Sequence, residues 1–154
     1  MSHLYVLCGC PGSGKTTWAH KNLRYDAYIS RDEIRFNLLR DNDNYFAHEK
    51  EVFDAFVKDI VSALKNGGNV VADATHIHHA SRAKLLKAID EQYINYDVRF
   101  IFFDTCLAVC SQRNAKREGR ARVPDVVIYT MFDRITLPTV GEFDNCIGVW
   151  IIRE

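Results

Sequence analysis

Short, almost continuously apolar runs alternate along the chain with longer segments of helical periodicity. Strands that are apolar on both faces are typical of a parallel sheet that helices cover. The pattern therefore predicts strands at residues 4–8, 69–72, 98–103 and 147–152, with a shorter one at 27–29.

Between these runs, apolar residues recur every three or four positions, which is typical of a helix with one buried face. Helices are expected at residues 52–64, 81–92 and 125–135. Gly67-Gly68 supplies the stop of the first, and Pro124 favours the start of the third. This alternation of strands and helices predicts a three-layer α/β domain, in which ligands bind beyond the carboxyl ends of the strands.

The composition limits how the chain meets a charged partner. Its 154 residues contain no Pro- or Ser-rich linker, so we expect one domain, residues 1–154.

The 20 Lys+Arg residues balance the 20 Asp+Glu residues, which gives a net charge of +0. A neutral domain has no overall attraction for nucleic acid or an anionic membrane, so a polyanion has to be bound by a local patch.

Neither a targeting segment nor a membrane partner is expected. The first residues have no basic region, and their apolar run is too short to span a bilayer. The five cysteines are an odd number without zinc-ligand spacing. Reduced, buried thiols are the expected state, and they favour a cytoplasmic location.

A phosphate-binding motif follows the first apolar run. Residues 9–16 match the P-loop pattern G-x-x-x-x-G-K-[ST] at every position. Its glycines permit positive φ values that turn backbone N–H groups toward a phosphate, and the next helix directs its positive dipole end at the same anion. A chance match in a glycine-rich turn is the alternative, but a predicted strand before the motif and a helix after it favour nucleotide binding. The predicted nucleotide-binding residues are Gly12, Ser13, Gly14, Lys15, Thr16 and Thr17.

The nucleotide expected at this motif is ATP or another NTP, with Mg²⁺. Lys15 is expected to reach the β- and γ-phosphates, and the Thr16 hydroxyl to ligate the metal. The base-reading motif of GTPase switches and the signature of transporter ATPases are both absent from the sequence. The chain is also short for a ring ATPase, so a small kinase is the best fit. Such an enzyme needs a carboxylate to position or deprotonate its acceptor, cationic groups and an acceptor pocket.

Residues 28–35 follow the second predicted strand and carry two charges of interest. Asp32 is placed to accept a proton from an attacking hydroxyl. Arg35 lies one helical turn further on and is a candidate for binding an acceptor phosphate. The alternative is a helix start, in which Ser30 is the N-cap, Glu33 completes a capping box and the charges are solvated. The local pattern leaves both interpretations open.

The most basic part of the chain is residues 113–122, with five basic residues and one acidic residue. Arginines on a mobile segment can close over a nucleotide and stabilise charge on the transferring phosphoryl group. A solvated loop at a helix end is the other interpretation of such a run. Because the same domain holds a P-loop, we predict a short basic lid at about residues 113–123.

These segments together resemble the 5′-kinase domain of phage-type polynucleotide kinases, within a wider group of small P-loop kinases. The resemblance covers most of residues 4–135. Its matching pieces are residues 9–17, 30–35, 70–76 followed by Arg82, and 113–117 followed by Val123-Pro124. It implies a P-loop kinase fold with a central, mostly parallel sheet and the basic lid. It also implies phosphoryl transfer from ATP to the 5′-OH end of DNA or RNA.

The resemblance assigns roles to particular residues. It implies that Asp32 is the general base and that Arg35 contacts the acceptor phosphate. Arg113 and Arg117 would meet the donor phosphates, so Lys15, Asp32, Arg35 and Arg117 form the expected catalytic set. Asp73 would support the metal through Thr16 or through water, and Asp104 fits the same loose pattern of an apolar run followed by Asp.

The sequence departs from the family pattern in two respects, and it leaves two other functions open. No second, phosphatase domain is present in these 154 residues, so 3′-phosphatase activity is not expected. The family's D-A-T-N pattern ends here in His76, which we expect, with His78 and His79, to be solvated or helix-capping rather than metal-binding. A kinase for a small hydroxyl compound or nucleotide sugar, and a nucleotide-dependent interaction module, are the alternatives. Nothing in the sequence indicates an oligomeric state.

Overall fold

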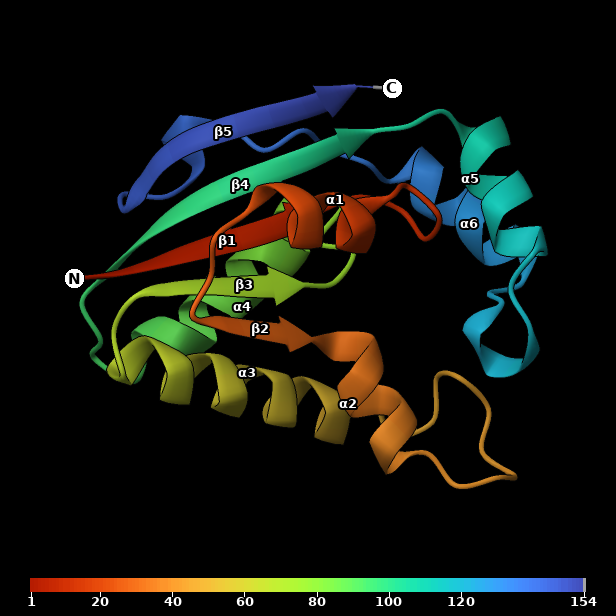
Figure 1. Ribbon diagram of the computed structural model, residues 1–154, viewed down its shortest axis with the longest axis horizontal. Coiled ribbons are helices and arrows are strands. Elements are labelled where there is room, and N and C mark those ends of the chain that lie inside the picture. The colour runs from red at the N-terminus through yellow and green to blue at the C-terminus, as the bar shows by residue number, and fades with distance from the viewer. Residues whose placement is uncertain (154) are drawn as a thin grey trace.

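A five-stranded parallel sheet forms the centre of the computed structural model, which describes residues 1–153 (Figure 1). The strand order is β2-β3-β1-β4-β5, and every neighbouring pair is parallel. The carboxyl ends of all the strands therefore meet at one edge. The strands are β1 (Ser2–Cys8), β2 (Ala27–Ser30), β3 (Asn69–Asp73), β4 (Tyr96–Asp104) and β5 (Cys146–Arg153). All five predicted strands are confirmed, each one or two residues longer at one or both ends.

Helices cover both faces of the sheet, which confirms the three-layer α/β architecture. α1 lies against one face, and α3 and α4 lie against the other (Figure 1). The helices are α1 (Lys15–Asn22), α2 (Arg31–Leu38), α3 (Glu49–Lys65), α4 (His79–Asp90), α5 (Leu107–Ala115) and α6 (Asp125–Asp133), with 3₁₀ turns at Gly119–Ala121 and Val140–Glu142. Within residues 1–153, none of these helices combines the length and apolar character needed to cross a bilayer.

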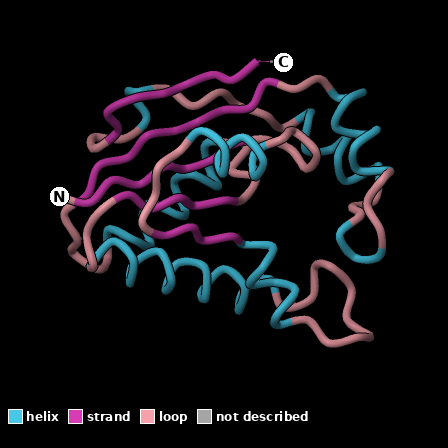
Figure 2. The backbone as a smooth tube through the Cα atoms, viewed as in Figure 1, coloured by secondary structure: helices cyan, strands magenta, loops and turns pink. Residues whose placement is uncertain are grey.

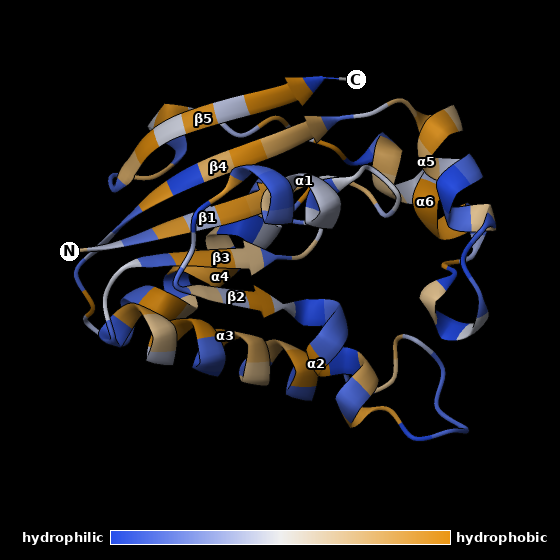
Figure 3. Ribbon diagram, viewed as in Figure 1, coloured by the Kyte–Doolittle hydropathy of each residue, from blue (hydrophilic) through white to orange (hydrophobic). Residues whose placement is uncertain are grey.

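The two faces of β1 explain why its sequence is apolar without alternation. Leu4 and Val6 are fully buried against α3 and α4, whereas Leu7 is fully buried on the α1 side. Successive strand residues point to opposite faces, so a strand covered on both sides is apolar throughout. In Figure 3 the inner strands are accordingly coloured as hydrophobic along most of their length. The pattern also fixes the register, because a slip of one residue would exchange the two faces.

The predicted helix boundaries hold with small shifts. α3 begins three residues before the predicted start and ends at Lys65, and Gly67 and Gly68 follow with φ values of +83° and +92°. These left-handed conformations favour glycine, which confirms the predicted stop. Pro124 is the N-cap of α6 and not part of its first turn. α5 is a helix that the apolar pattern did not predict.

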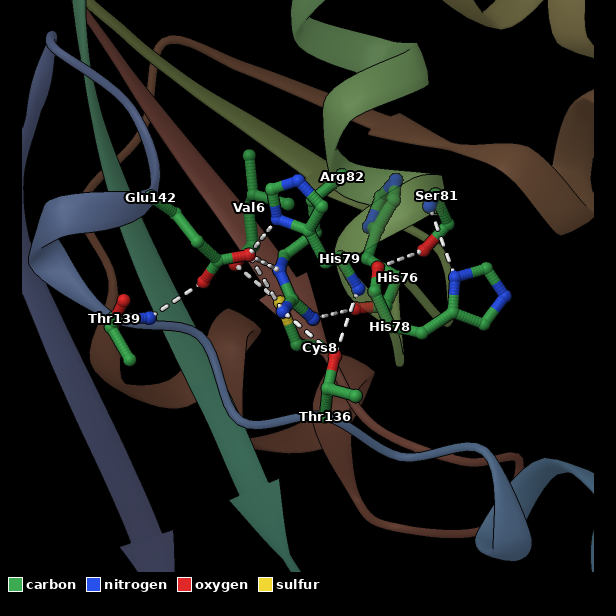
Figure 4. A network of polar contacts seen from close by, with 10 residues as sticks. All are labelled: Val6, Cys8, His76, His78, His79, Ser81, Arg82, Thr136, Thr139 and Glu142. Carbon is green, nitrogen blue, oxygen red and sulfur yellow. Dashed lines mark hydrogen bonds and ion pairs between the residues drawn. The ribbon is translucent and has the colours of Figure 1, made fainter.

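A buried ion pair ties α4 to the turn before β5 (Figure 4). Arg82 is fully buried, and its guanidinium donates to Glu142 Oε1 from Nη2 at 2.9 Å and from Nε at 3.2 Å. The same guanidinium donates to the backbone oxygen of His76 at 3.0 Å and to Thr136 Oγ1 at 3.3 Å. A buried charge is tolerated when it is paired and its donors are used, so Arg82 holds three segments in one place.

The three histidines of residues 76–79 have three different environments. His78 is the N-cap of α4 and accepts a hydrogen bond from Ser81 N, so the capping interpretation is confirmed for it. His79 is exposed and pairs with Glu142 at 2.7 Å. His76 is buried, which makes its prediction as a solvated or capping residue wrong. Its Nδ1–H donates to Leu7 O at 2.9 Å, and its backbone is left-handed with φ 43°.

His76 makes the fold sensitive to acid. Burial lowers the pKa of this imidazole from 6.5 to about 4. Between these two pH values the unfolded chain binds a proton that the folded chain does not, so the free energy of unfolding falls as the pH drops. We expect a loss of about 3 kcal/mol across this window, measured by urea denaturation at a series of pH values.

The matched variant is His76→Asn, because asparagine adopts left-handed φ easily and does not titrate. Its free energy of unfolding should change less between pH 6.5 and pH 4 than that of the wild type. His20→Asn, at an exposed histidine, should keep the wild-type dependence. The same dependence in wild type and His76→Asn would show that His76 is not the responsible group.

Candidate active site

The P-loop connects β1 to α1 at the carboxyl edge of the sheet. Gly12 and Gly14 have φ values of +80° and +91°, and Gly14 is the N-cap of α1. A Cβ atom on Gly12 would lie 2.5 Å from the backbone oxygen of Cys110 in α5. Side chains are therefore excluded at Gly12 by both backbone conformation and contact, which explains the glycine there.

Two buried polar groups give the loop the chemistry of an anion site. The Ser13 hydroxyl is buried and has no hydrogen-bond partner among residues 1–153. The Lys15 ammonium is buried beside it and donates to Gly9 O at 2.9 Å and to Cys10 O at 3.2 Å. Burial lowers the pKa of Lys15, and the nearby carboxylate of Asp73 opposes that shift. An orphaned donor and a desolvated cation both fit a phosphate.

Asp73, at the end of β3, is the carboxylate that meets the P-loop. The Thr16 hydroxyl donates to Asp73 Oδ2 at 2.7 Å. Asp104 instead lies exposed at the end of β4 and pairs with Arg153 at 3.4 Å. The structure thus places Asp73, and not Asp104, beside Thr16. No cluster of three or more His, Cys, Asp or Glu side chains within residues 1–153 could hold a metal. The donor set suits Mg²⁺, which takes most of its ligands from phosphates and water.

The start of α2 contains both an N-cap residue and a residue that lines a cavity. Ser30 is the N-cap, and its hydroxyl accepts a hydrogen bond from Glu33 N at 3.3 Å. Asp32, in the same turn, lines a cavity of about 210 Å³ at the carboxyl edge of the sheet. The predicted N-cap at Ser30 is therefore confirmed, whereas the expectation that the charges of this segment are solvated is wrong for Arg35, which is buried.

Asp32 belongs to a charge cluster that includes two residues missed in the sequence, Glu49 and Tyr45. Arg35 is buried, and its Nη1 donates to Asp32 Oδ1. Its Nη2 and Nε donate to Glu49 Oε1 at 2.9 Å and 3.0 Å. The Tyr45 hydroxyl donates to the same Oδ1 of Asp32 at 2.6 Å, and the Tyr45 ring lies 4.2 Å from the Arg35 guanidinium. Burial, then the Asp32 charge, raises the pKa of Tyr45.

A second arginine of α2 also faces this cavity. Arg31 donates from Nη2 to Glu49 Oε2 at 3.1 Å. Its Nε is buried without a hydrogen-bond partner among residues 1–153. Burial lowers the pKa of Arg31, and Glu49 opposes the shift. An unsatisfied buried donor on a cation is a favourable contact for an anion.

The cavity brings most of the sequence-predicted residues together. Figure 2 shows loops gathering at this edge, beyond the strand ends. Six predicted residues line the cavity: Lys15, Thr16, Asp32, Arg35, Asp73 and Arg117. Arg113 is not among its lining residues and donates from Nη1 to Gly12 O at 3.2 Å. Thr17 is exposed on the first turn of α1.

The basic segment is anchored at its base by a residue whose role the sequence did not reveal. Asn114 is fully buried at the end of α5. Its side chain donates to Val123 O at 2.6 Å and accepts from Val123 N at 3.0 Å. These two bonds close the chain between residues 114 and 123 into a loop with a fixed base.

The tip of the same loop touches the connection between α2 and α3. Arg120 Nη1 donates to the backbone oxygens of Arg40 at 2.5 Å and Asp43 at 3.3 Å. Residues 40 and 43 lie between α2 and α3, so this contact joins the basic loop to a connection whose Tyr45 and Phe46 line the cavity. Exposed Arg117 lies between the anchored base and the bridged tip.

A second, more apolar hollow of about 320 Å³ adjoins the first. Both are lined by Phe46, Thr75 and Met131. Its other walls include Ile77 and Val127. A flat apolar group attached to a molecule in the first cavity would find contact surface here.

Comparison with known proteins places this geometry among nucleotide-binding domains. A family model described as an AAA domain matches residues 4–138. A chain in the structure of the Pnkp1/Rnl/Hen1 RNA repair complex is 25% identical with a TM-score of 0.71, and the match covers 86% of this chain and 43% of that one. This chain thus spans less than half the length of that relative.

Two further solved structures share the fold. Chaetomium thermophilum Kti12 in complex with ADP-AlF3 is 16% identical with a TM-score of 0.68, and 97% of this chain and 88% of that one are covered. A sugar kinase from Janibacter sp. is 17% identical with a TM-score of 0.61, covering 99% and 85% of the two chains. The shared fold confirms the P-loop kinase architecture.

Lys15 offers the first test of this site. Removing its ammonium in Lys15→Ala should weaken ADP binding by roughly tenfold or more, because charge-assisted hydrogen bonds to phosphate are lost. Isothermal titration calorimetry measures this directly. Lys21→Ala, on the last turn of the same helix, is the matched control and should bind as the wild type does. Equal affinity of Lys15→Ala and wild type would exclude nucleotide binding at the P-loop.

Proposed function

This chain belongs to the AAA domain family and is a P-loop kinase-like domain, and we propose that it is an ATP-dependent polynucleotide 5′-hydroxyl kinase. The observation that carries the proposal is the cavity in which the carboxylate of Asp32 shares one space with Lys15, Thr16 and Arg117. Phosphoryl transfer needs these groups together: a base, groups that bind the phosphates and a cation that stabilises the developing charge.

The donor would be held by the P-loop. Lys15, the Ser13 hydroxyl and the backbone N–H groups of residues 12–16 would bind the phosphates of ATP. Thr16 and, through Thr16 or water, Asp73 would hold Mg²⁺, which neutralises charge on the β- and γ-phosphates when bound. Arg113, beside Gly12, would contact the donor from the α5 side.

The proton of the acceptor hydroxyl would go to Asp32. Both side-chain hydrogen bonds that the described residues give this carboxylate end on Oδ1, from Arg35 and Tyr45. Oδ2 is therefore the oxygen available to accept the proton. The two donors fix the orientation of the carboxylate before the acceptor binds, which is the positioning that phosphoryl transfer requires.

The acceptor phosphate has two candidate partners. The guanidinium of Arg35 already serves Asp32 and Glu49, so its contact with the acceptor phosphate stays a prediction from the family resemblance. Arg31 presents a buried Nε without a protein partner in residues 1–153, in the same cavity. We propose that Arg31 shares the binding of the acceptor phosphate, and that Arg35 chiefly positions Asp32.

Residues 113–123 would form the lid of this single domain. The base of the lid is fixed by Asn114, and its tip reaches Arg40 and Asp43 through Arg120. Arg117 then lies over the cavity, where it would stabilise charge on the transferring phosphoryl group.

The two adjoining hollows support an oligonucleotide end as the acceptor. The first cavity offers cations and a carboxylate, and the second offers an apolar wall for a nucleobase. The RNA repair complex that contains one relative supports a nucleic-acid acceptor. The sugar kinase with the same fold supports the second candidate, a small hydroxyl acceptor.

End labelling tests the proposal. Incubated with γ-labelled ATP and Mg²⁺, the protein should transfer label to a short 5′-OH oligonucleotide and not to the same oligonucleotide that already carries a 5′-phosphate. Absence of transfer to both DNA and RNA, with transfer to a small alcohol, would replace the proposal by its second candidate.

Asp32→Asn tests the base. The amide cannot accept the proton, so kcat should fall by roughly 10²- to 10⁴-fold while ADP binding stays unchanged. Glu33→Gln changes the neighbouring exposed carboxylate and should retain the wild-type rate. Wild-type turnover in Asp32→Asn would remove Asp32 from the reaction.

Arg117→Ala tests the lid. Loss of a cation that acts in the transition state should lower kcat by roughly 10²-fold or more with little effect on thermal stability. Arg122→Ala is the control, because Arg122 is an exposed arginine of the same segment and does not line the cavity. Equal rates in the two variants would identify the segment as a solvated loop.

A further inference from the structure

Tyr28 connects β2 to the carboxylate of Asp73, the residue proposed to support the metal. It lies in β2, two residues before the N-cap of α2, and its side chain is partly buried. The Tyr28 hydroxyl donates to Asp73 Oδ2 at 2.5 Å. Its ring stacks on His20 of α1, with 4.3 Å between the ring centroids. Tyr28 therefore contacts both Asp73 and α1, the helix that follows the P-loop.

Asp73 Oδ2 receives two hydrogen bonds, and both come from hydroxyl groups. One comes from Thr16 at 2.7 Å and the other from Tyr28. Among residues 1–153 these are the side-chain hydrogen bonds of this carboxylate, so Oδ1 is left to accept from water. Because the hydrogen of the Thr16 hydroxyl is committed to Asp73, the oxygen of Thr16 keeps its lone pairs for a cation.

We infer, on the basis of the nucleotide-binding half of the proposed function, that Tyr28 is a positioning residue for the Mg²⁺–nucleotide site. Its hydroxyl holds the carboxylate of Asp73 in the rotamer that accepts from Thr16, and thereby fixes the Thr16 oxygen as a ligand. Groups that orient a metal ligand affect metal affinity without touching the metal.

The pairing of the strands does not by itself fix the orientation of the Asp73 carboxylate. The register of β2 and β3 pairs Ser30 with Asp73, which sets the backbone positions. The side-chain torsions of an aspartate at a strand end still have several staggered states. Two donors on one oxygen select a single state. A ring that only filled space at residue 28 would not need a hydroxyl.

Tyr28→Phe isolates the hydroxyl, because the ring and its stacking on His20 are kept. With Mn²⁺ as the probe for the metal, binding of Mn²⁺ to the ADP complex should weaken by about tenfold, as followed by electron paramagnetic resonance. Binding of ADP in the presence of a chelator should not change. Tyr25→Phe is the matched control, since the Tyr25 hydroxyl bonds to His20 and not to Asp73.

Asp73→Ala completes the test as a double-mutant cycle. In that background Tyr28→Phe should cause no further loss of Mn²⁺ affinity, because its effect passes through the carboxylate. Wild-type affinity in Tyr28→Phe, equal losses in Tyr28→Phe and Tyr25→Phe, or an additive loss in the double variant would each overturn the inference. No acceptor is present in these measurements, so a failure here is distinct from a failure of polynucleotide kinase activity.

Discussion

The position of β3 between β1 and β2 is the constraint on which the site depends. In the sheet, Asp73 pairs with Leu7 of β1 on one side and with Ser30 of β2 on the other. The P-loop follows β1, and the segment with Asp32 follows β2. The Asp73 carboxylate at the end of β3 thus lies between the P-loop and the segment that carries Asp32. Thr16, at the end of the P-loop, and Tyr28, in β2, both donate hydrogen bonds to this carboxylate.

The side of the cavity formed by α2 and the start of α3 is held together by charge rather than by apolar packing. Arg35 is buried among Asp32, Tyr45 and Glu49, and Arg31 shares the Glu49 carboxylate. Buried charges are costly unless they are paired, so each partner restricts the others to one geometry. Arg31 keeps a buried Nε without a hydrogen-bond partner among residues 1–153, so a chain of net charge +0 still presents a cationic donor at this cavity.

The strands, the P-loop and the helix after it follow from the sequence because local pattern determines them. The continuous apolar runs require a sheet that is covered on both faces, and the glycines at 12 and 14 permit the left-handed backbone of the P-loop. α5 escapes such an analysis, since Cys110 and Asn114 are its buried residues and no apolar face marks it.

The partners of the predicted site residues depend on contacts that are distant in sequence. Glu49 reaches Arg35 across the connection between α2 and α3, and Tyr28 reaches Asp73 over 45 residues. His76 is buried because Leu7 and Phe56 surround it, which no local pattern encodes. The sequence therefore predicts which groups gather at the cavity, while the tertiary structure shows how they are oriented.

The stereochemical course of transfer tests most directly whether donor and acceptor meet in this one cavity. With ATP made chiral at the γ-phosphorus, transfer to the 5′-OH of an oligonucleotide should proceed with inversion, because Asp32 and the P-loop would hold the attacking and leaving oxygens in line. Retention of configuration would contradict direct transfer and would require a phosphorylated protein side chain as an intermediate.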